Sequence, residues 1–322
     1  MMVRLCAFFL VFVTSLAHAA APSVLQRPIE LDTGSGVLYG SLLLPKSASP
    51  VPVALIIAGS GPTNRDGNNP MSGRNDSYKR LAELLARNGI ASVRYDKRGI
   101  AASTAAQPDE RNLSVEGYAA DAVAWGKKLK ADPRFGPLIL IGHSEGALIA
   151  SLAAQPAGAA AIVSLSGSGR PLADVLREQL KERMPAELQP RSEQLIERLS
   201  AGQFDPDVPP QLQVLFRPSV QPYLVSLLRQ DPAQAFGRLS IPALIVQGRN
   251  DIQVGVVDAQ ALKAARPDAQ LALIDGMNHV LRIVPMDTRA QLESYKNPKL
   301  PLANELGRTL VTFIHGINKG IN

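Results

Sequence analysis

A serine flanked by glycines lies in the middle of the sequence, in Gly142-His143-Ser144-Glu145-Gly146. The apolar run at 138–141 before it predicts a strand, and the apolar run at 147–154 after it predicts a helix. In such a strand–turn–helix, glycines allow the sharp turn while the serine holds strained backbone angles. The pattern therefore predicts Ser144 as a nucleophile for acyl transfer. The backbone N–H of Glu145 would then point toward the developing oxyanion.

A serine hydroxyl needs a neighbouring base, and only four histidines can supply one. His18 lies in the N-terminal segment, and the side chain of His143 is expected to point away from Ser144. His315 lies in the last helix, near the end of the chain, and remains a weaker alternative. His279, which follows a predicted strand at 270–274, is therefore the predicted general base.

Short apolar runs alternate with amphipathic helical patterns along most of the chain. This alternation predicts an α/β fold, in which helices cover both faces of a mostly parallel central sheet. Residues 170–239 differ, because they carry helical patterns and a proline-rich stretch but no buried strand. We expect this segment to form a helical lid inserted after the sixth strand. The predicted strands are at 29–31 and 37–44, which form a hairpin, and at 53–57, 90–95, 138–141, 160–165, 243–247 and 270–274.

The serine motif and its flanking elements resemble the α/β-hydrolase fold, and are similar to the branch grouped with serine aminopeptidases and monoglyceride lipases. The likeness covers about residues 53–165 and 241–314. In that fold the chain order is serine, acid, histidine, which implies Asp251 as the acid because it directly follows the strand at 243–247. Its carboxylate would orient His279 and stabilise the imidazolium. Asp258 and Asp275 are weaker rivals.

The second oxyanion donor is expected in the loop after the first parallel strand. Related enzymes commonly have His-Gly there, where this chain has Ala58-Gly59. The resemblance implies the backbone N–H of Ser60 as the donor, with Gly61 as the neighbouring possibility. Further along this loop, we expect Arg65 and Asp66 to pair with each other rather than to shape the rim of the site.

A second stretch, Arg94-Tyr95-Asp96-Lys97-Arg98-Gly99, matches a motif that the family usually continues with Gly-x-Ser. Here Ala101-Ala102-Ser103 stands in that place, so the usual glycine is replaced by an alanine. The replacement bears on the local turn and leaves the predicted triad unaffected.

The N-terminus is typical of a secretory signal peptide, with Arg4, an apolar run at 5–16 and small residues around a cleavage site after Ala19. The apolar run is too short to span a bilayer comfortably. We therefore expect an exported protein, periplasmic or secreted, without stable membrane insertion after cleavage. The expected organisation is a signal at 1–19, hydrolase core at 20–169, lid at 170–239 and core again at 240–322. The single cysteine, Cys6, lies in the signal, which excludes disulfides and thiolate chemistry from the mature chain.

Composition excludes several other classes of function. The formal net charge is +6, but the basic residues are scattered and aromatic residues make up only 5% of the chain, which disfavours nucleic-acid binding. Few histidines are left once His18 of the signal and the predicted base His279 are set aside, and no His-Glu-x-x-His motif occurs, so no metal is expected. The glycines at 59–61 lack the Gly-Lys-Ser/Thr of a phosphate-binding loop, so no cofactor is implied. The sequence does not define an oligomeric state.

The sequence thus predicts a serine hydrolase that cleaves a small-molecule ester through an acyl-enzyme on Ser144. A serine aminopeptidase or a thioesterase would use the same triad, although an exported chain argues against coenzyme A thioesters. A non-catalytic binding protein on this scaffold is a further alternative, but such proteins typically lack a triad member. An aminopeptidase would need lid carboxylates to hold the substrate ammonium, for which the candidates are Glu178, Glu182, Glu187, Glu193 and Glu197.

Overall fold

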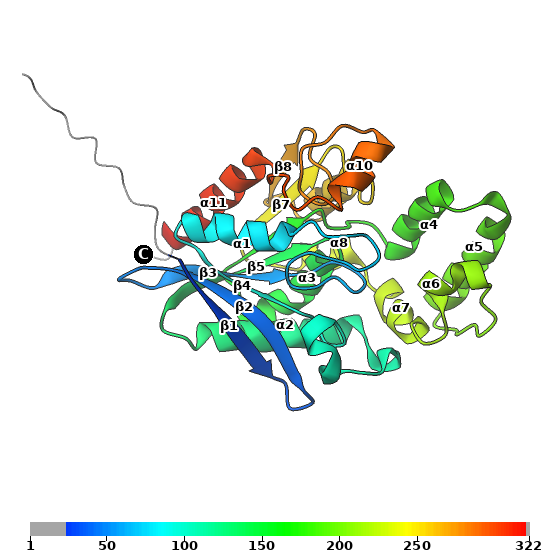
Figure 1. The fold of residues 1–322 in the computed structure, drawn as a ribbon, viewed down its shortest axis with the longest axis horizontal. Coiled ribbons are helices and arrows are strands. Elements are labelled where there is room, and N and C mark those ends of the chain that lie inside the picture. Colours follow the sequence, from blue (N-terminus) through cyan, green and yellow to red (C-terminus); the bar gives the residue numbers. More distant parts are fainter. Residues whose placement is uncertain (1–23, 320–322) are drawn as a thin grey trace, which may run out of the picture.

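The computed structural model describes residues 24–319, so the predicted signal peptide and its cleavage site lie outside the described residues. Within this range one eight-stranded sheet has the order β1-β2-β4-β3-β5-β6-β7-β8 (Figure 1). The strands are β1 (Val24–Asp32), β2 (Val37–Pro45), β3 (Val51–Ile57), β4 (Ala91–Tyr95), β5 (Phe135–His143), β6 (Ala161–Leu165), β7 (Ala243–Gly248) and β8 (Gln270–Ile274).

The sheet is mostly parallel, as the sequence predicts. The strands from β3 to β8 pair in parallel, whereas β1 and β2 form the predicted hairpin and β2 pairs antiparallel with β4. Every residue of β3, β4, β6 and β7 is buried. Strands buried on both faces read as nearly continuous apolar runs, as β3 does, which is why the sequence reveals them.

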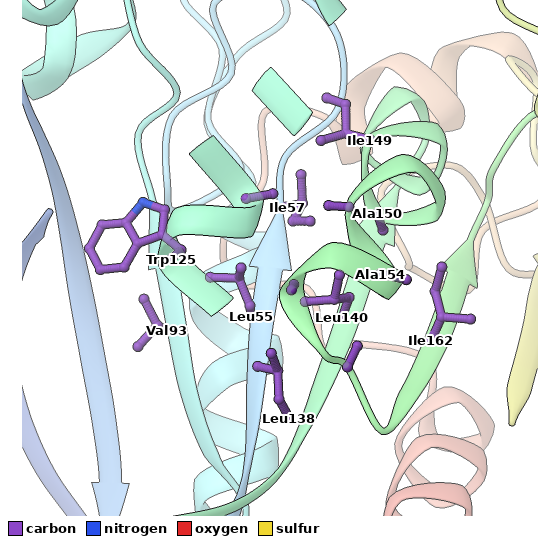
Figure 2. Packing of buried hydrophobic residues seen from close by; sticks show 14 of the residues in the cluster. Leu55, Ile57, Val93, Trp125, Leu138, Leu140, Ile149, Ala150, Ala154 and Ile162 are labelled. Carbon is purple, nitrogen blue, oxygen red and sulfur yellow. The ribbon is translucent and has the colours of Figure 1, made fainter. Parts of the chain in front are cut away.

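Helices cover both faces of the sheet, and a hydrophobic core lies on each side. One face carries α1 (Ser77–Arg87) and α11 (Asn304–Lys319); the other carries α2 (Val115–Lys130), α3 (Glu145–Ala157) and α9 (Val256–Ala265). Figure 2 shows Trp125 of α2 and the small side chains Ala150 and Ala154 of α3 against Leu55 and Leu140 of the sheet. Small residues let α3 approach the sheet closely, and this helix begins directly after Ser144.

Between β6 and β7 the chain forms the helices α4 (Leu172–Arg183), α5 (Gln189–Ser200), α6 (Gln213–Phe216), α7 (Gln221–Leu228) and α8 (Pro232–Gly237). The segment from α4 to α7, called the helical insertion below, projects beyond the end of the sheet (Figure 1). It has a hydrophobic cluster of its own, which includes Leu195, Leu199 and Phe216. Helix α8 instead packs against α3 and α9, and its Phe236 belongs to the core of the sheet.

Polar contacts attach the helical insertion to the core at two places. Near α9, Arg170 pairs with the fully buried Asp258 and with Glu178 of α4. Near α2, Glu110 accepts hydrogen bonds from Arg217 and Ser219. The insertion is therefore attached at both flanks of the sheet end from which it projects.

The remaining described helices are short. They are α10 (Thr288–Ser294) and the 3₁₀ helices at Ala101–Ala106, Glu110–Asn112, Ala186–Leu188 and Pro210–Leu212. The 3₁₀ helix at Ala101–Ala106 begins at Ala101, which has a φ of 45° and stands where the family usually has glycine. The turn is kept despite the alanine, because Ala102 N donates to Asp96 and Ser103 Oγ accepts from Tyr39 N.

Candidate active site

Ser144 lies at a sharp turn between β5 and α3. Its backbone angles, φ 54° and ψ −123°, are outside the regions that residues other than glycine usually occupy. The turn is held in the sheet, since Ser144 N donates to Leu165 O at the end of β6. A strained conformation of this kind persists only where the surrounding structure enforces it.

The two glycines of the motif are required by close backbone contacts. A Cβ atom on Gly142 would lie 2.1 Å from Gly146 O, and one on Gly146 would lie 2.3 Å from Ile57 O. Both distances are well inside van der Waals contact. The glycine at each position therefore allows α3 to begin directly above the sheet, and this places Ser144 at the carboxyl edge of the parallel strands.

His279 and Asp251 meet at the same edge of the sheet. His279 follows β8 and Asp251 follows β7, and His279 Nδ1 lies 2.8 Å from Asp251 Oδ2. The other carboxylate oxygen accepts the backbone N–H groups of Gln253 and Val254. Burial raises the pKa of the Asp251 carboxyl, but His279 and these two N–H groups outweigh it, so the pKa lies below its usual value. Asp251 is thus an ionised acceptor that fixes the orientation of the imidazole.

The weaker alternatives lie elsewhere. Asp275 is exposed and pairs with Arg249, while Asp258 is fully buried and pairs with Arg170. His315 bonds through Nε2 to Asn88 O, at the end of α1. In the described part of the chain, the partner of His279 Nδ1 is Asp251, the acid that the chain order implies.

His143 connects the turn at Ser144 to His279. Its Nε2 lies 2.8 Å from the backbone oxygen of His279, and the two rings lie 4.7 Å apart, centroid to centroid. Because a carbonyl can only accept, Nε2 must carry the proton, so neutral Nδ1 accepts from the Tyr78 hydroxyl at 2.8 Å. Burial, and then the neighbouring His279, lower the pKa of His143 to about 3. His143 is therefore a neutral structural link and not a second base.

The loop after β3 approaches the same turn. A Cβ atom on Gly59 would lie 3.1 Å from Ser144 Cβ, and Gly59 N donates to the Tyr78 hydroxyl. Ser60, the next residue, is exposed. Glu145 is the first residue of α3, so its N–H has no acceptor within the helix. The predicted oxyanion donors thus belong to two segments that converge on Ser144.

The expectation that Arg65 and Asp66 pair with each other is wrong. Arg65 pairs with Asp96 at 2.6 Å, and Asp66 pairs with Arg94 at 2.8 Å. Arg65 and Asp66 are the central residues of a turn that is closed by a hydrogen bond from Gly67 N to Asn64 O, and each of them reaches a separate partner at the end of β4. These two ion pairs fasten the long loop to the sheet, which agrees with the structural role that the sequence favours.

Two residues of the site do not follow from the triad motifs. Tyr78 lies on α1, and Lys97 lies two residues beyond β4, within the stretch that matches a family motif. The Lys97 ammonium contacts Gly59 O and the Glu145 carboxylate. For Lys97, the signal in the sequence is the motif at 94–99. The contacts of Lys97 could not be read from that motif, because they join it to segments far apart in the chain.

Among the side chains that the structure describes, which leave out those of 182, 183 and 319, no group of three or more histidine, cysteine, aspartate or glutamate residues is arranged to hold a metal ion. Within residues 24–319, no helix combines the length and apolar character needed to cross a membrane.

Comparisons with known proteins bear on the family and the fold of this chain. A family model described as the alpha/beta hydrolase family matches residues 55–293. The chain is similar to Esterase EstD from Thermotoga maritima, with 30% identity over 259 residues. That match covers 78% of this chain and 60% of the relative, so the chain spans less than two thirds of the relative's length.

Solved structures share the fold at lower identity. Est1E from Butyrivibrio proteoclasticus with bound ferulic acid has a TM-score of 0.58 and 18% identity, and the match covers 89% of this chain and 99% of that one. Proline iminopeptidase from Mycobacterium smegmatis has a TM-score of 0.60 and 16% identity, with 92% of this chain and 100% of that one covered. At such identities the similarity concerns the fold.

Proposed function

Because the chain belongs to the alpha/beta hydrolase family, we propose that it is a serine hydrolase that cleaves carboxylic esters, with Ser144 as its nucleophile. One observation carries the proposal. A strained serine turn and a His279–Asp251 hydrogen bond meet at the carboxyl edge of a parallel sheet. Such edges are where open α/β sheets bind their ligands. The similarity to Esterase EstD supports an ester as the substrate.

In the proposed reaction, Ser144 Oγ attacks the ester carbonyl while His279 Nε2 takes the hydroxyl proton. The backbone N–H groups of Ser60 and Glu145 stabilise the oxyanion. The bond to the alcohol then breaks, and His279 gives the proton to the leaving oxygen. Water attacks the acyl-enzyme by the same route, which releases the acid and restores Ser144. Asp251 keeps the imidazole oriented and stabilises its protonated form in both steps.

Two of the five glutamates named as candidates to hold a substrate ammonium are already paired with arginines, which favours an ester over an aminoacyl amide. The side chain of a third, Glu182, lies outside the described residues. Glu178 pairs with Arg170, and Glu193 pairs with Arg177. Glu187 and Glu197 are both exposed. A carboxylate that already pairs with an arginine is poorly suited to hold a substrate ammonium. An aminopeptidase of the related branch would need a free carboxylate at the site.

Two further expectations belong to the same proposal. The helical insertion would act as the lid that sets the acyl and alcohol preference, since it projects beyond the end of the sheet (Figure 1). The signal-like sequence at 1–19 would direct export to the periplasm or the medium. Both are compatible with a small ester substrate and require neither a cofactor nor a nucleic acid.

The test is a substrate panel on the purified mature protein. We expect turnover of p-nitrophenyl acetate or butyrate, and much slower release of p-nitroaniline from aminoacyl p-nitroanilides. A fluorophosphonate probe should label the wild type and fail to label Ser144→Ala. The matched control is Ser49→Ala, because Ser49 is exposed in the loop between β2 and β3.

The outcomes separate the candidates. Loss of esterase activity and of labelling in Ser144→Ala, with both retained in Ser49→Ala, supports the proposal. Wild-type ester turnover in Ser144→Ala would refute it. Preferential cleavage of aminoacyl anilides would point to an aminopeptidase, and a wild type that resists labelling would point to a binding protein.

A further inference from the structure

Lys97 is a buried cation directly behind the proposed oxyanion hole. Its side chain is 1% exposed, although a lysine normally keeps its ammonium in water. Burying a charge is costly unless the group is paired and hydrogen-bonded. The position of Lys97 therefore depends on the partners that surround its ammonium.

Three different partners surround that ammonium. Nζ lies 2.6 Å from Gly59 O and 3.4 Å from Glu145 Oε1. It also lies 4.7 Å from the centroid of the Tyr118 ring, a cation–π distance. An ammonium has three N–H donors and no acceptor, so a carbonyl, a carboxylate and a ring face together satisfy it.

The carbonyl contact acts on the proposed donor itself. Gly59 C=O and Ser60 N–H belong to one planar peptide unit, and the described chain contains no cis peptide bond. In a trans peptide the C=O and N–H bonds point in opposite directions. An ammonium that holds the oxygen therefore directs the Ser60 N–H away from Lys97, and it also polarises the amide so that the N–H donates more strongly.

The other two contacts fix this arrangement in place. Gly59 N donates to Tyr78, so Gly59 is held through its N–H and its C=O. The carboxylate belongs to Glu145, the residue whose own N–H is the other proposed donor. A single ammonium thus joins the two segments that supply the oxyanion hole.

We propose that Lys97 is a positioning residue, which holds the Gly59–Ser60 peptide and the start of α3 in the geometry that binds the oxyanion. This inference rests on the proposed function of Ser144. The competing explanation is that Lys97 only neutralises the buried Glu145 carboxylate, one oxygen of which has no hydrogen-bond partner in the structure.

The experiment removes Lys97 in two backgrounds. Lys97→Met is compared with the wild type, and Lys97→Met/Glu145→Gln is compared with Glu145→Gln. The second comparison contains no unpaired buried carboxylate. An oxyanion-hole residue acts mainly on the transition state, so kcat for p-nitrophenyl butyrate should fall about 10–100-fold in both backgrounds. KM should change less than about threefold. Circular dichroism and thermal melting identify variants that do not fold.

An inhibitor gives a second readout. An alkyl boronic acid forms a tetrahedral adduct on the nucleophile and mimics the oxyanion, so its affinity should fall by about the same factor as kcat/KM. Lys97→Arg keeps the charge and should recover part of the loss. Lys299→Met, at an exposed lysine, is the matched control and should leave kcat, KM and boronate affinity unchanged.

The proposal is overturned if Lys97→Met lowers activity in the native background but not in the Glu145→Gln background, because neutralisation would then explain the effect. It is also overturned if KM rises while kcat and boronate affinity stay constant. These results differ from a failure of the proposed function, in which the wild type itself would lack ester turnover or Ser144→Ala would retain it.

Discussion

Lowering the pH from 8 to 4.5 is expected to destabilise the folded protein through His143. In the folded state this ring is buried, it accepts a hydrogen bond from Tyr78 and it donates one to His279 O. Protonation of His143 Nδ1 would remove the lone pair that accepts the hydrogen bond from the Tyr78 hydroxyl. The folded pKa is therefore lowered to about 3, whereas an unfolded chain has a histidine pKa of about 6.5.

The sign and size of the effect follow from these two pKa values. Below pH 6.5 the unfolded chain binds a proton that the folded protein does not, so stability falls as the pH falls. The contribution of neutral His143 is fully present above about pH 6.5 and is lost progressively toward pH 3. At pH 4.5 the loss extends over about two pH units, each of which is worth about 1.4 kcal/mol. We therefore expect about 2–3 kcal/mol less stability from this ring alone.

The assay is urea unfolding at pH 8, 6.5, 5.5 and 4.5, on the wild type and on His143→Gln. Glutamine keeps a polar side chain at the position but does not titrate, so the difference between the proteins excludes the carboxylates. We expect the wild type to be the more stable at pH 8 and its advantage to shrink by about 2–3 kcal/mol by pH 4.5. Parallel stability–pH curves for the two proteins would refute the assignment of His143 as a buried neutral ring.

Two other predictions concern the acid and the strained alanine. Asp251→Asn should lower kcat for p-nitrophenyl butyrate by on the order of 10³–10⁴-fold with the fold intact by circular dichroism. A neutral amide can donate as well as accept, so it neither holds the required tautomer of His279 nor stabilises the imidazolium. Near wild-type turnover would contradict this. Ala101→Gly should raise the free energy of unfolding by about 0.5–1 kcal/mol, because relief of the left-handed conformation exceeds the added freedom of the unfolded chain. Urea unfolding checks this, and a less stable variant would contradict it.

The strained turn at Ser144 could be predicted from sequence because it is local. The glycines at 142 and 146 and the apolar runs around them determine the strand, the turn and the helix within a few residues. His279 is the predicted base because so few histidines compete, and Asp251 is the predicted acid because its place follows from the chain order that the resemblance implies. The bond between them at 2.8 Å is a tertiary contact that the sequence anticipated only through the resemblance.

Contacts that join distant segments could not be predicted in the same way. Arg65 and Asp66 find their partners at the end of β4, about thirty positions along the chain, and nothing in the local pattern specifies them. Lys97 reaches Gly59 for a similar reason, since charge and spacing do not say which side chain becomes buried. The polar side chains of the site were thus predictable as residue types but not as a network.

Several strands are longer than the sequence predicts, most clearly the largely exposed strand β1. The hairpin strand predicted at 29–31 extends over Val24–Asp32, and most residues of this strand are exposed. Backbone pairing with β2 holds the whole length of β1. Because backbone pairing does not require apolar side chains, the exposed part of the strand shows no alternation of apolar and polar residues in the sequence. Helix α8 is likewise too short to show its period, although Phe236 anchors it in the main core.

The helical insertion contains its own hydrophobic cluster, which is distinct from the two cores that flank the sheet. Segments with a separate core form cooperative units that can open without global unfolding. The turn at Ser144 and the His279–Asp251 pair depend on the sheet and its covering helices instead. Under the proposed function, the insertion can therefore be redesigned or replaced to change the substrate preference, while the turn at Ser144 and the His279–Asp251 pair keep their geometry.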